Sequence, residues 1–168
     1  MNGHPGGQAH TLRMLELSGL SGGRVLDLGA GAGESVALLR ERGFDAEGID
    51  LTPRGSAVRA GNLLRTEYPD GCFDGLLSQC SFYVSGDVPG ALRESFRILK
   101  TGGMLMLSDV WFEDAAARIR KAGFSIAYQE DLTELWREYY FAALWNGTAP
   151  VCRVPGKCRY MLYICKKR

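Results

Sequence analysis

The sequence lacks the features that would assign it to a membrane or secreted class of protein. Among its 168 residues the longest apolar runs, such as 104–112, fall far short of the roughly 20 residues that a membrane-spanning helix needs. The first ten residues, MNGHPGGQAH, lack the charged and apolar regions of a signal peptide. We therefore expect a cytoplasmic protein without a membrane partner.

An excess of charge of one sign is also missing. Twenty Lys and Arg residues against 19 Asp and Glu residues leave a net charge of +1, and the two signs are interspersed along the chain. A basic stripe, which would indicate a nucleic-acid partner, is absent. The charge pattern therefore predicts no nucleic-acid partner.

The paired spacing of a disulfide framework is missing from the cysteines, which are irregularly spaced. Five cysteines are an odd number without a C-x-x-C pair, which argues against a secreted disulfide framework. We interpret them as reduced core and surface residues and predict no metal site. The alternative is a thiophilic metal or metalloid site at Cys152, Cys158 and Cys165.

The residues that are present predict a single globular domain. Apolar residues make up 46% and charged residues 23%, and no linker or internal repeat divides the chain. Short apolar segments alternate with segments of helical periodicity, which is the order of a βαβ protein. The predicted strands lie at 24–28, 44–50, 73–78, 104–109, 124–130 and 159–166, and the predicted helices at 33–43, 86–100, 114–123 and 132–147.

This order predicts an α/β fold, a single-domain open, mostly parallel twisted sheet with helices on both faces. The last predicted strand, 159–166, alternates less cleanly than the others between apolar and polar residues. We therefore expect it to be antiparallel or to lie at an edge of the sheet.

Three alternate glycines stand between the first predicted strand and helix, in the stretch RVLDLGAGAGES at 24–35. Because glycine has no side chain, Gly29, Gly31 and Gly33 let the backbone approach a ligand closely, and the following helix start offers free N–H groups. One strand later, Asp50 is placed where a carboxylate accepts hydrogen bonds from both hydroxyls of a ribose. The combination indicates a ligand that contains a nucleoside.

NAD-binding domains also have a glycine turn and an acid. Here the turn reads D-x-G-x-G-x-G, and Glu34 stands where the dinucleotide pattern G-x-G-x-x-G has its third glycine. The carboxylate of Asp27 beside the ligand suits a cationic sulfonium better than a diphosphate. A nucleotide-linked oxidoreductase is thus the disfavoured alternative.

Several segments, in this order, resemble the class I (Rossmann-like) S-adenosylmethionine-dependent methyltransferases of small-molecule type. VLDLGAGAGES resembles the first motif of that family and GIDLTP its second, while 61–84 and 92–109 resemble the regions of its fourth and fifth strands. The resemblance covers roughly 24–109. It implies an enzyme that transfers a methyl group from S-adenosyl-L-methionine to an O, N, C or S atom of a small molecule, with S-adenosyl-L-homocysteine as the product.

The resemblance also implies roles for individual residues. Asp27 and the glycine turn would hold the methionine part of the cofactor, Asp50 the ribose, and Leu51 the adenine ring. Asn62 replaces an aspartate frequent in the family, but its amide oxygen can still accept a hydrogen bond from the adenine amino group. The implied cofactor-binding residues are Asp27, Gly29, Ala30, Gly31, Gly33, Asp50, Leu51, Asn62, Leu63, Ser78 and Gln79.

In the family, the segment after the fourth strand faces the transferred methyl group. The candidates there are Ser78, Gln79, Cys80, Phe82 and Tyr83. We name Cys80, Tyr83 and His10 as catalytic candidates, although Cys80 also fits a small packing residue at a strand end. His4 and His10 lie in a glycine-rich segment that can fold over the cofactor as a lid. If the acceptor must lose a proton, the candidates for the base are Tyr83, Asp109, Glu138 and His10.

The resemblance suggests three parts within the single domain: an N-terminal helix or lid at 1–20, a cofactor-binding core at 24–109, and helices and final strands at 110–168. Few residues separate the strand at 104–109 from the next helix, where many relatives carry an insertion over the acceptor. We therefore expect an open acceptor site, for a bulky substrate or completed by a homodimer or a partner subunit. A non-catalytic cofactor-binding module and a thiophilic metalloid methyltransferase are the alternatives.

Overall fold

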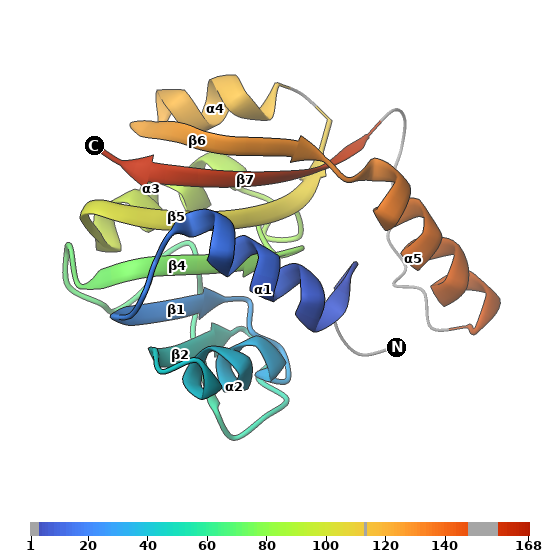
Figure 1. The fold of residues 1–168 in the computed structure, drawn as a ribbon, viewed down its shortest axis with the longest axis horizontal. Coiled ribbons are helices and arrows are strands. Elements are labelled where there is room, and N and C mark those ends of the chain that lie inside the picture. Colours follow the sequence, from blue (N-terminus) through green and yellow to red (C-terminus); the bar gives the residue numbers. More distant parts are fainter. Residues whose placement is uncertain (1–3, 113, 148–157) are drawn as a thin grey trace.

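The computed structural model describes residues 4–112, 114–147 and 158–168, which form one sheet flanked by helices (Figure 1). The strand order is β3-β2-β1-β4-β5-β7-β6. The strands are β1 (Arg24–Leu28), β2 (Asp45–Asp50), β3 (Val58–Ala60), β4 (Phe73–Gln79), β5 (Leu99–Trp111), β6 (Phe124–Asp131) and β7 (Arg159–Lys167). The helices are α1 (Gly7–Ser18), α2 (Glu34–Glu41), α3 (Val88–Ile98), α4 (Ala115–Lys121) and α5 (Thr133–Trp145).

The predicted, mostly parallel sheet is confirmed. β1 pairs in parallel with both β2 and β4, and β4 pairs in parallel with β5. The chain moves outward from β1 to β2 and β3, and then returns to place β4 on the other side of β1. The carboxyl ends of β1 and β4 therefore form the topological switch point, where open α/β sheets bind ligands.

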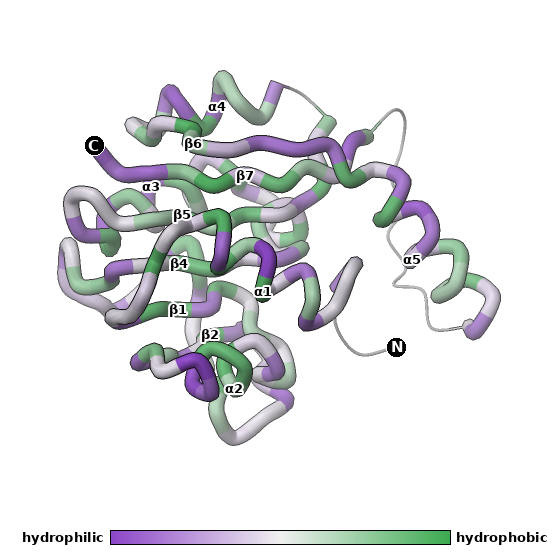
Figure 2. The backbone as a smooth tube through the Cα atoms, viewed as in Figure 1, coloured by the Kyte–Doolittle hydropathy of each residue, from purple (hydrophilic) through white to green (hydrophobic). Residues whose placement is uncertain are grey.

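The last strand is antiparallel, as predicted. The alternative prediction, that it lies at an edge of the sheet, is wrong. β7 runs antiparallel to both β5 and β6, and β6 forms the edge. Residues 162–165 of β7 are all buried, so both of its faces are covered and its polar and apolar residues do not alternate. Figure 2 shows that the edge strand β6 is the more hydrophilic of the two.

Helices cover both faces of the sheet, as predicted. Met14 and Leu15 of α1 and Leu39 of α2 pack with apolar residues of β1, β4, β5 and β7 on one face. Leu92 of α3 and Ile119 of α4 pack in the core on the other face. In Figure 1, α1 and α2 lie in front of the sheet and α5 projects beyond the carboxyl ends of the parallel strands. None of the described helices has the length and apolar character needed to cross a membrane.

The structure adds two features to the predicted elements. β3 has only three residues, too few for a periodic pattern to show in the sequence. β5 begins at Leu99, directly after α3, rather than after the glycine pair at 102–103. The glycines lie within this long strand, where Gly102 ends the exposed stretch 100–102 and Gly103 begins the buried stretch 103–111.

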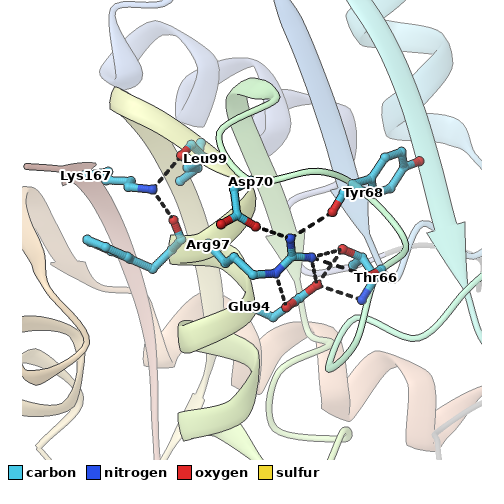
Figure 3. A network of polar contacts seen from close by, with 8 residues as sticks. Thr66, Tyr68, Asp70, Glu94, Arg97, Leu99 and Lys167 are labelled. Carbon is cyan, nitrogen blue, oxygen red and sulfur yellow. Dashed lines mark hydrogen bonds and ion pairs between the residues drawn. The ribbon is translucent and has the colours of Figure 1, made fainter.

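A charged network ties α3 to the loop that follows β3 (Figure 3). The guanidinium of Arg97 donates to both carboxylate oxygens of Glu94, to Asp70 Oδ1 at 2.6 Å and to the carbonyl of Tyr68 at 2.9 Å. Glu94 in turn accepts from the backbone N–H of Thr66 at 2.7 Å. The loop 61–72 is thus held against α3 from several points.

Replacing Arg97 with methionine is expected to lower the free energy of unfolding by about 1–2 kcal/mol, because several charge-assisted bonds are lost from a partly exposed side chain. Arg93→Met on the same helix is the matched control, since Arg93 is exposed and reaches Asp87 only at 3.9 Å. Urea unfolding of both variants measures the difference. Equal losses would show that the network does not hold the loop.

Candidate active site

The turn between β1 and α2 has the backbone conformation that its glycines allow. Gly29, Gly31 and Gly33 have φ angles of 86°, 52° and 85°, which L side chains rarely adopt. A Cβ atom at Gly29 would lie 2.5 Å from Ser81 Cβ, so the turn also packs directly on the chain after β4. Gly33 caps the N-terminus of α2.

Asp50, at the end of β2, is bonded to this turn. Its Oδ2 accepts from the N–H of Gly31 at 2.9 Å, and its Oδ1 accepts from the N–H of Thr52 at 2.9 Å. These two bonds fix the carboxylate at the carboxyl edge of the sheet.

Asp27 is a second carboxylate at the switch point. Its side chain is buried, and burial raises its pKa to about 7, with the negative charge of Asp50 adding to the effect. A cation beside Asp27 would stabilise its ionised form.

Two cavities follow the carboxyl ends of β1, β2 and β4. One, of about 270 Å³, contains Asp27, Glu34, Gln79 and Cys80 in its wall, and the other, of about 200 Å³, contains Leu51 and Asn62. The two share Gly29, Asp50, Ser81 and Val84. We call this continuous depression the switch-point groove.

The groove brings together most of the predicted cofactor-binding residues. Leu51 is 71% exposed in its wall and free to pack on a planar ring. Asn62 Oδ1 accepts from the N–H of Leu64 at 2.9 Å, so this oxygen already has one partner. The predicted residues that line the groove are Asp27, Gly29, Ala30, Gly31, Asp50, Leu51, Asn62, Leu63 and Gln79.

Two predicted cofactor-binding residues lie outside its wall. Ser78 is completely buried and donates to the carbonyl of Leu28 at 3.3 Å, so it joins β4 to β1. Gly33 acts through its backbone conformation at the start of α2. Neither residue lines the groove.

The three catalytic candidates are dispersed. Cys80 lines the groove, whereas Tyr83 packs on Phe112 with ring centroids 5.2 Å apart and lines another cavity. His10 is buried, with its Nε2 at 3.0 Å from Ser108 Oγ. Phe82, also named from the sequence, is completely buried in the core.

Cys80 has an unusual backbone. Among the described residues it is the non-glycine residue with a positive φ, 58°, a conformation that costs about 1–3 kcal/mol. Its thiol donates to the hydroxyl oxygen of Tyr160 at 3.4 Å, and burial raises its pKa to about 12. The thiol is therefore protonated at neutral pH.

His4, rather than His10, reaches the groove from the N-terminal segment. Its Nδ1 lies 3.1 Å from Gln79 Nε2, and Gln79 Oε1 accepts from Thr11 and Ser35, each at 3.2 Å. Burial lowers the pKa of both histidines, that of His10 to about 4. The segment before α1 thus forms part of the groove wall, while both imidazoles are neutral at neutral pH.

The other base candidates do not meet at the groove. Asp109 Oδ2 accepts from the N–H groups of Phe82 and Tyr83 at 2.7 and 3.2 Å, and Oδ1 accepts from Val110 at 2.7 Å. Burial raises its pKa to about 6, and these bonds oppose the rise. Asp109 therefore holds the turn after β4, and Glu138 is exposed on α5.

Sequence reasoning missed Arg54 and Ser81. Arg54 lines the groove, and its guanidinium lies next to Gly31, where a Cβ would meet it at 2.7 Å. Ser81 touches Gly29. The signal for Ser81 was its position inside the segment 78–83. Nothing in the sequence indicated that Arg54 folds back over the glycine turn.

The proposed cysteine site is only partly described. Cys165 is completely buried in the core and Cys158 is half-buried, while Cys152 lies outside the described residues. Within 4–112, 114–147 and 158–168, no three His, Cys, Asp or Glu side chains are grouped to hold a metal ion.

Comparison with known proteins identifies relatives. The family described as "Methyltransferase domain" matches residues 8–150. The chain is 33% identical over 117 residues to an arsenite methyltransferase of Aquipseudomonas alcaligenes, covering 55% of this chain and 34% of that protein. It is 34% identical over 100 residues to a demethylmenaquinone methyltransferase of Thermus thermophilus. This match covers 50% of this chain and 46% of that protein. The match thus spans about a third to a half of these curated relatives.

The fold is shared with solved structures. A geranyl diphosphate C-methyltransferase from Streptomyces coelicolor, solved with Mg²⁺, geranyl diphosphate and S-adenosyl-L-homocysteine, superposes with a TM-score of 0.73. The match covers 95% of this chain and 79% of that chain at 16% identity. At this identity the likeness establishes the fold.

Proposed function

The chain belongs to the methyltransferase-domain family, and from this premise we propose that it binds S-adenosyl-L-methionine in the switch-point groove and transfers its methyl group to a small molecule. The observation that carries the proposal is the wall of the groove, to which the glycine turn, Asp50 and Asp27 all contribute. When bound, S-adenosyl-L-methionine supplies a methyl group activated by a positively charged sulfur.

The residues of the groove fit this ligand. Asp50, which is fixed by its bond to Gly31, would accept from the two ribose hydroxyls, and exposed Leu51 would cover one face of adenine. Asp27 supplies a negative charge for the sulfonium or the amino group. Gly29 and Gly31 line the groove with backbone and present no side chain to the ligand.

Methyl transfer from a sulfonium is an in-line displacement, so the protein acts by holding the acceptor atom, carbon and sulfur in line in a dry site. Gln79 and Cys80 form the wall at the end of β4, where hydrogen bonds to Thr11 and Tyr160 hold them. Neither of these two residues is a general base, since the thiol of Cys80 stays protonated and an amide does not take up a proton. The imidazole of His4, which is neutral and also lines the groove, can accept a proton from the acceptor.

Calorimetric titration with S-adenosylmethionine, S-adenosylhomocysteine and NAD tests the proposal. Micromolar binding of S-adenosylmethionine and S-adenosylhomocysteine without binding of NAD supports the proposal. Binding of NAD alone would contradict it and favour the oxidoreductase hypothesis. Transfer of labelled methyl to an acceptor then separates an enzyme from a non-catalytic binding module.

For the acceptor, we propose an aromatic small molecule of hydroquinone type. Tyr83, Trp111 and Phe112 line a cavity of about 240 Å³ at the exits of β4 and β5, and such walls suit a planar ring. β5 ends at Trp111 and α4 begins at Ala115, so this side carries only a short connection. We propose that the site is open, for a bulky acceptor or for completion by a second subunit. Labelled transfer to a hydroquinone but not to arsenite supports this choice over a metalloid acceptor.

The affinity for S-adenosylmethionine is expected to rise with pH between 5.5 and 7. The pKa of Asp27 is raised to about 7 in the free protein, and a bound cation favours the carboxylate, so binding releases a proton below this pH. The dissociation constant should fall up to tenfold per pH unit and level off above 7. S-adenosylhomocysteine, which has no sulfonium charge, should show a shallower slope.

Asp27→Asn, whose amide does not titrate, is the control for this pH dependence. Calorimetry in buffers of different ionisation enthalpy measures the released proton directly. An unchanged slope in Asp27→Asn would assign the effect to another group.

A further inference from the structure

Two hydroxyl groups inside the protein join Cys80 to His10. The Cys80 thiol donates to the hydroxyl oxygen of Tyr160 at 3.4 Å, and the Tyr160 hydroxyl donates to Ser108 Oγ at 3.1 Å. Ser108 Oγ lies 3.0 Å from His10 Nε2. Tyr160 and Ser108 are completely buried, and the four residues come from the end of β4, from β7, from β5 and from α1.

The members of this chain of hydrogen bonds are neutral at neutral pH. Burial raises the pKa of Cys80 to about 12 and that of Tyr160 well above its usual value, and it lowers the pKa of His10 to about 4. The Cys80 thiol donates to Tyr160 and the Tyr160 hydroxyl donates to Ser108, whose Oγ is within hydrogen-bond distance of His10 Nε2. A neutral, fully bonded chain serves to fix geometry rather than to take up a proton.

The geometry that it fixes is that of Cys80. This residue has a left-handed φ of 58°, its thiol is bonded to Tyr160, and its N–H donates to the carbonyl of Ser108 at 2.9 Å. Cys80 lines the part of the groove that contains Asp27, not the part that contains Leu51 and Asn62. Its neighbour Ser81 packs on Gly29, where the two parts join.

We propose that Tyr160 is a positioning residue for methyl transfer, which holds Cys80 and the wall of the groove against the sulfonium of the cofactor. The inference rests on the proposed function, because it needs a sulfonium in the groove. S-adenosylmethionine and S-adenosylhomocysteine differ only in the methyl group and charge at sulfur. The ratio of their dissociation constants therefore reports on this wall without an acceptor.

Calorimetric titration of Tyr160→Phe with both ligands is the test. We expect S-adenosylmethionine to bind five- to tenfold more weakly, with S-adenosylhomocysteine within twofold of the wild type. Tyr163→Phe is the matched control, because Tyr163 lies on the same strand in the core of the opposite face and should leave the ratio unchanged. Equal weakening of both ligands, or an unchanged ratio, would overturn the proposal.

If Tyr160→Phe does not fold, substitutions at Cys80 test the same effect on the ratio of the two dissociation constants. Cys80→Ser retains a donor for Tyr160 and should retain the ratio. Cys80→Gly accepts the left-handed backbone without a donor and should reproduce the change of Tyr160→Phe. The same ratio in the Ser and Gly variants would overturn the positioning role, whereas wild-type protein that binds neither ligand would overturn the proposed function itself.

Discussion

Replacing Asp50 with alanine is expected to weaken the binding of S-adenosylmethionine and S-adenosylhomocysteine about a hundredfold. In the proposed complex the carboxylate accepts hydrogen bonds from two ribose hydroxyls, and bonds to a charged group contribute about 1.5–3 kcal/mol each. Its present bonds to the N–H groups of Gly31 and Thr52 also hold the two loops of the groove together. Because about 1.4 kcal/mol corresponds to a factor of ten in the dissociation constant, a hundredfold loss corresponds to about 2.8 kcal/mol, which is less than two such hydrogen bonds contribute at most.

The control for this change is Asp45→Ala, at the exposed opposite end of the same strand, which should bind both ligands as the wild type does. A 2′,3′-dideoxy analogue of S-adenosylhomocysteine tests the ribose contact itself. The wild type should bind the analogue far more weakly than the parent, and Asp50→Ala should bind the two alike. A large preference for the parent ligand in Asp50→Ala would assign the ribose to another residue.

The order of the helices and strands could be predicted from the sequence because most of them carry a complete periodic pattern. The glycine turn follows β1 directly and Asp50 ends β2, so a correct strand assignment also predicts their meeting at the switch point. The interior position of β7 could not be predicted. Its neighbours are chosen by tertiary packing, and burial on both faces erased the alternation that marks a strand direction.

At the site, the direction in which each side chain points could not be predicted from the sequence. Ser78 and Cys80 are two residues apart, yet one is sealed between β1 and β4 and the other turns into the groove through a left-handed backbone. The bonds from Tyr160 to both Cys80 and Ser108 cross 80 and 52 positions of the chain. No local pattern contains such pairs, so Tyr160 and Ser108 could only be found in three dimensions.

Gly29→Ala is expected to lower the free energy of unfolding by about 3 kcal/mol and to weaken cofactor binding by at least tenfold. The left-handed φ of 86° costs a β-carbon about 1–2 kcal/mol. The new methyl group also meets Ser81 Cβ at 2.5 Å, and overpacking costs about 1–3 kcal/mol more. Relief of this clash requires the chain after β4 to move away from β1, which widens the groove where its two parts join.

Gly43→Ala separates the two causes, because Gly43 has a φ of 85° but open space where its Cβ would lie. It should lose only the backbone contribution of about 1–2 kcal/mol and bind the cofactor normally. Adding Ser81→Gly to Gly29→Ala removes the atom that the new methyl group meets, and should return the loss toward that of Gly43→Ala. Urea unfolding and titration with S-adenosylhomocysteine measure both effects. Equal losses in Gly29→Ala and Gly43→Ala would mean that backbone strain, and not the contact with Ser81, makes glycine necessary at this turn.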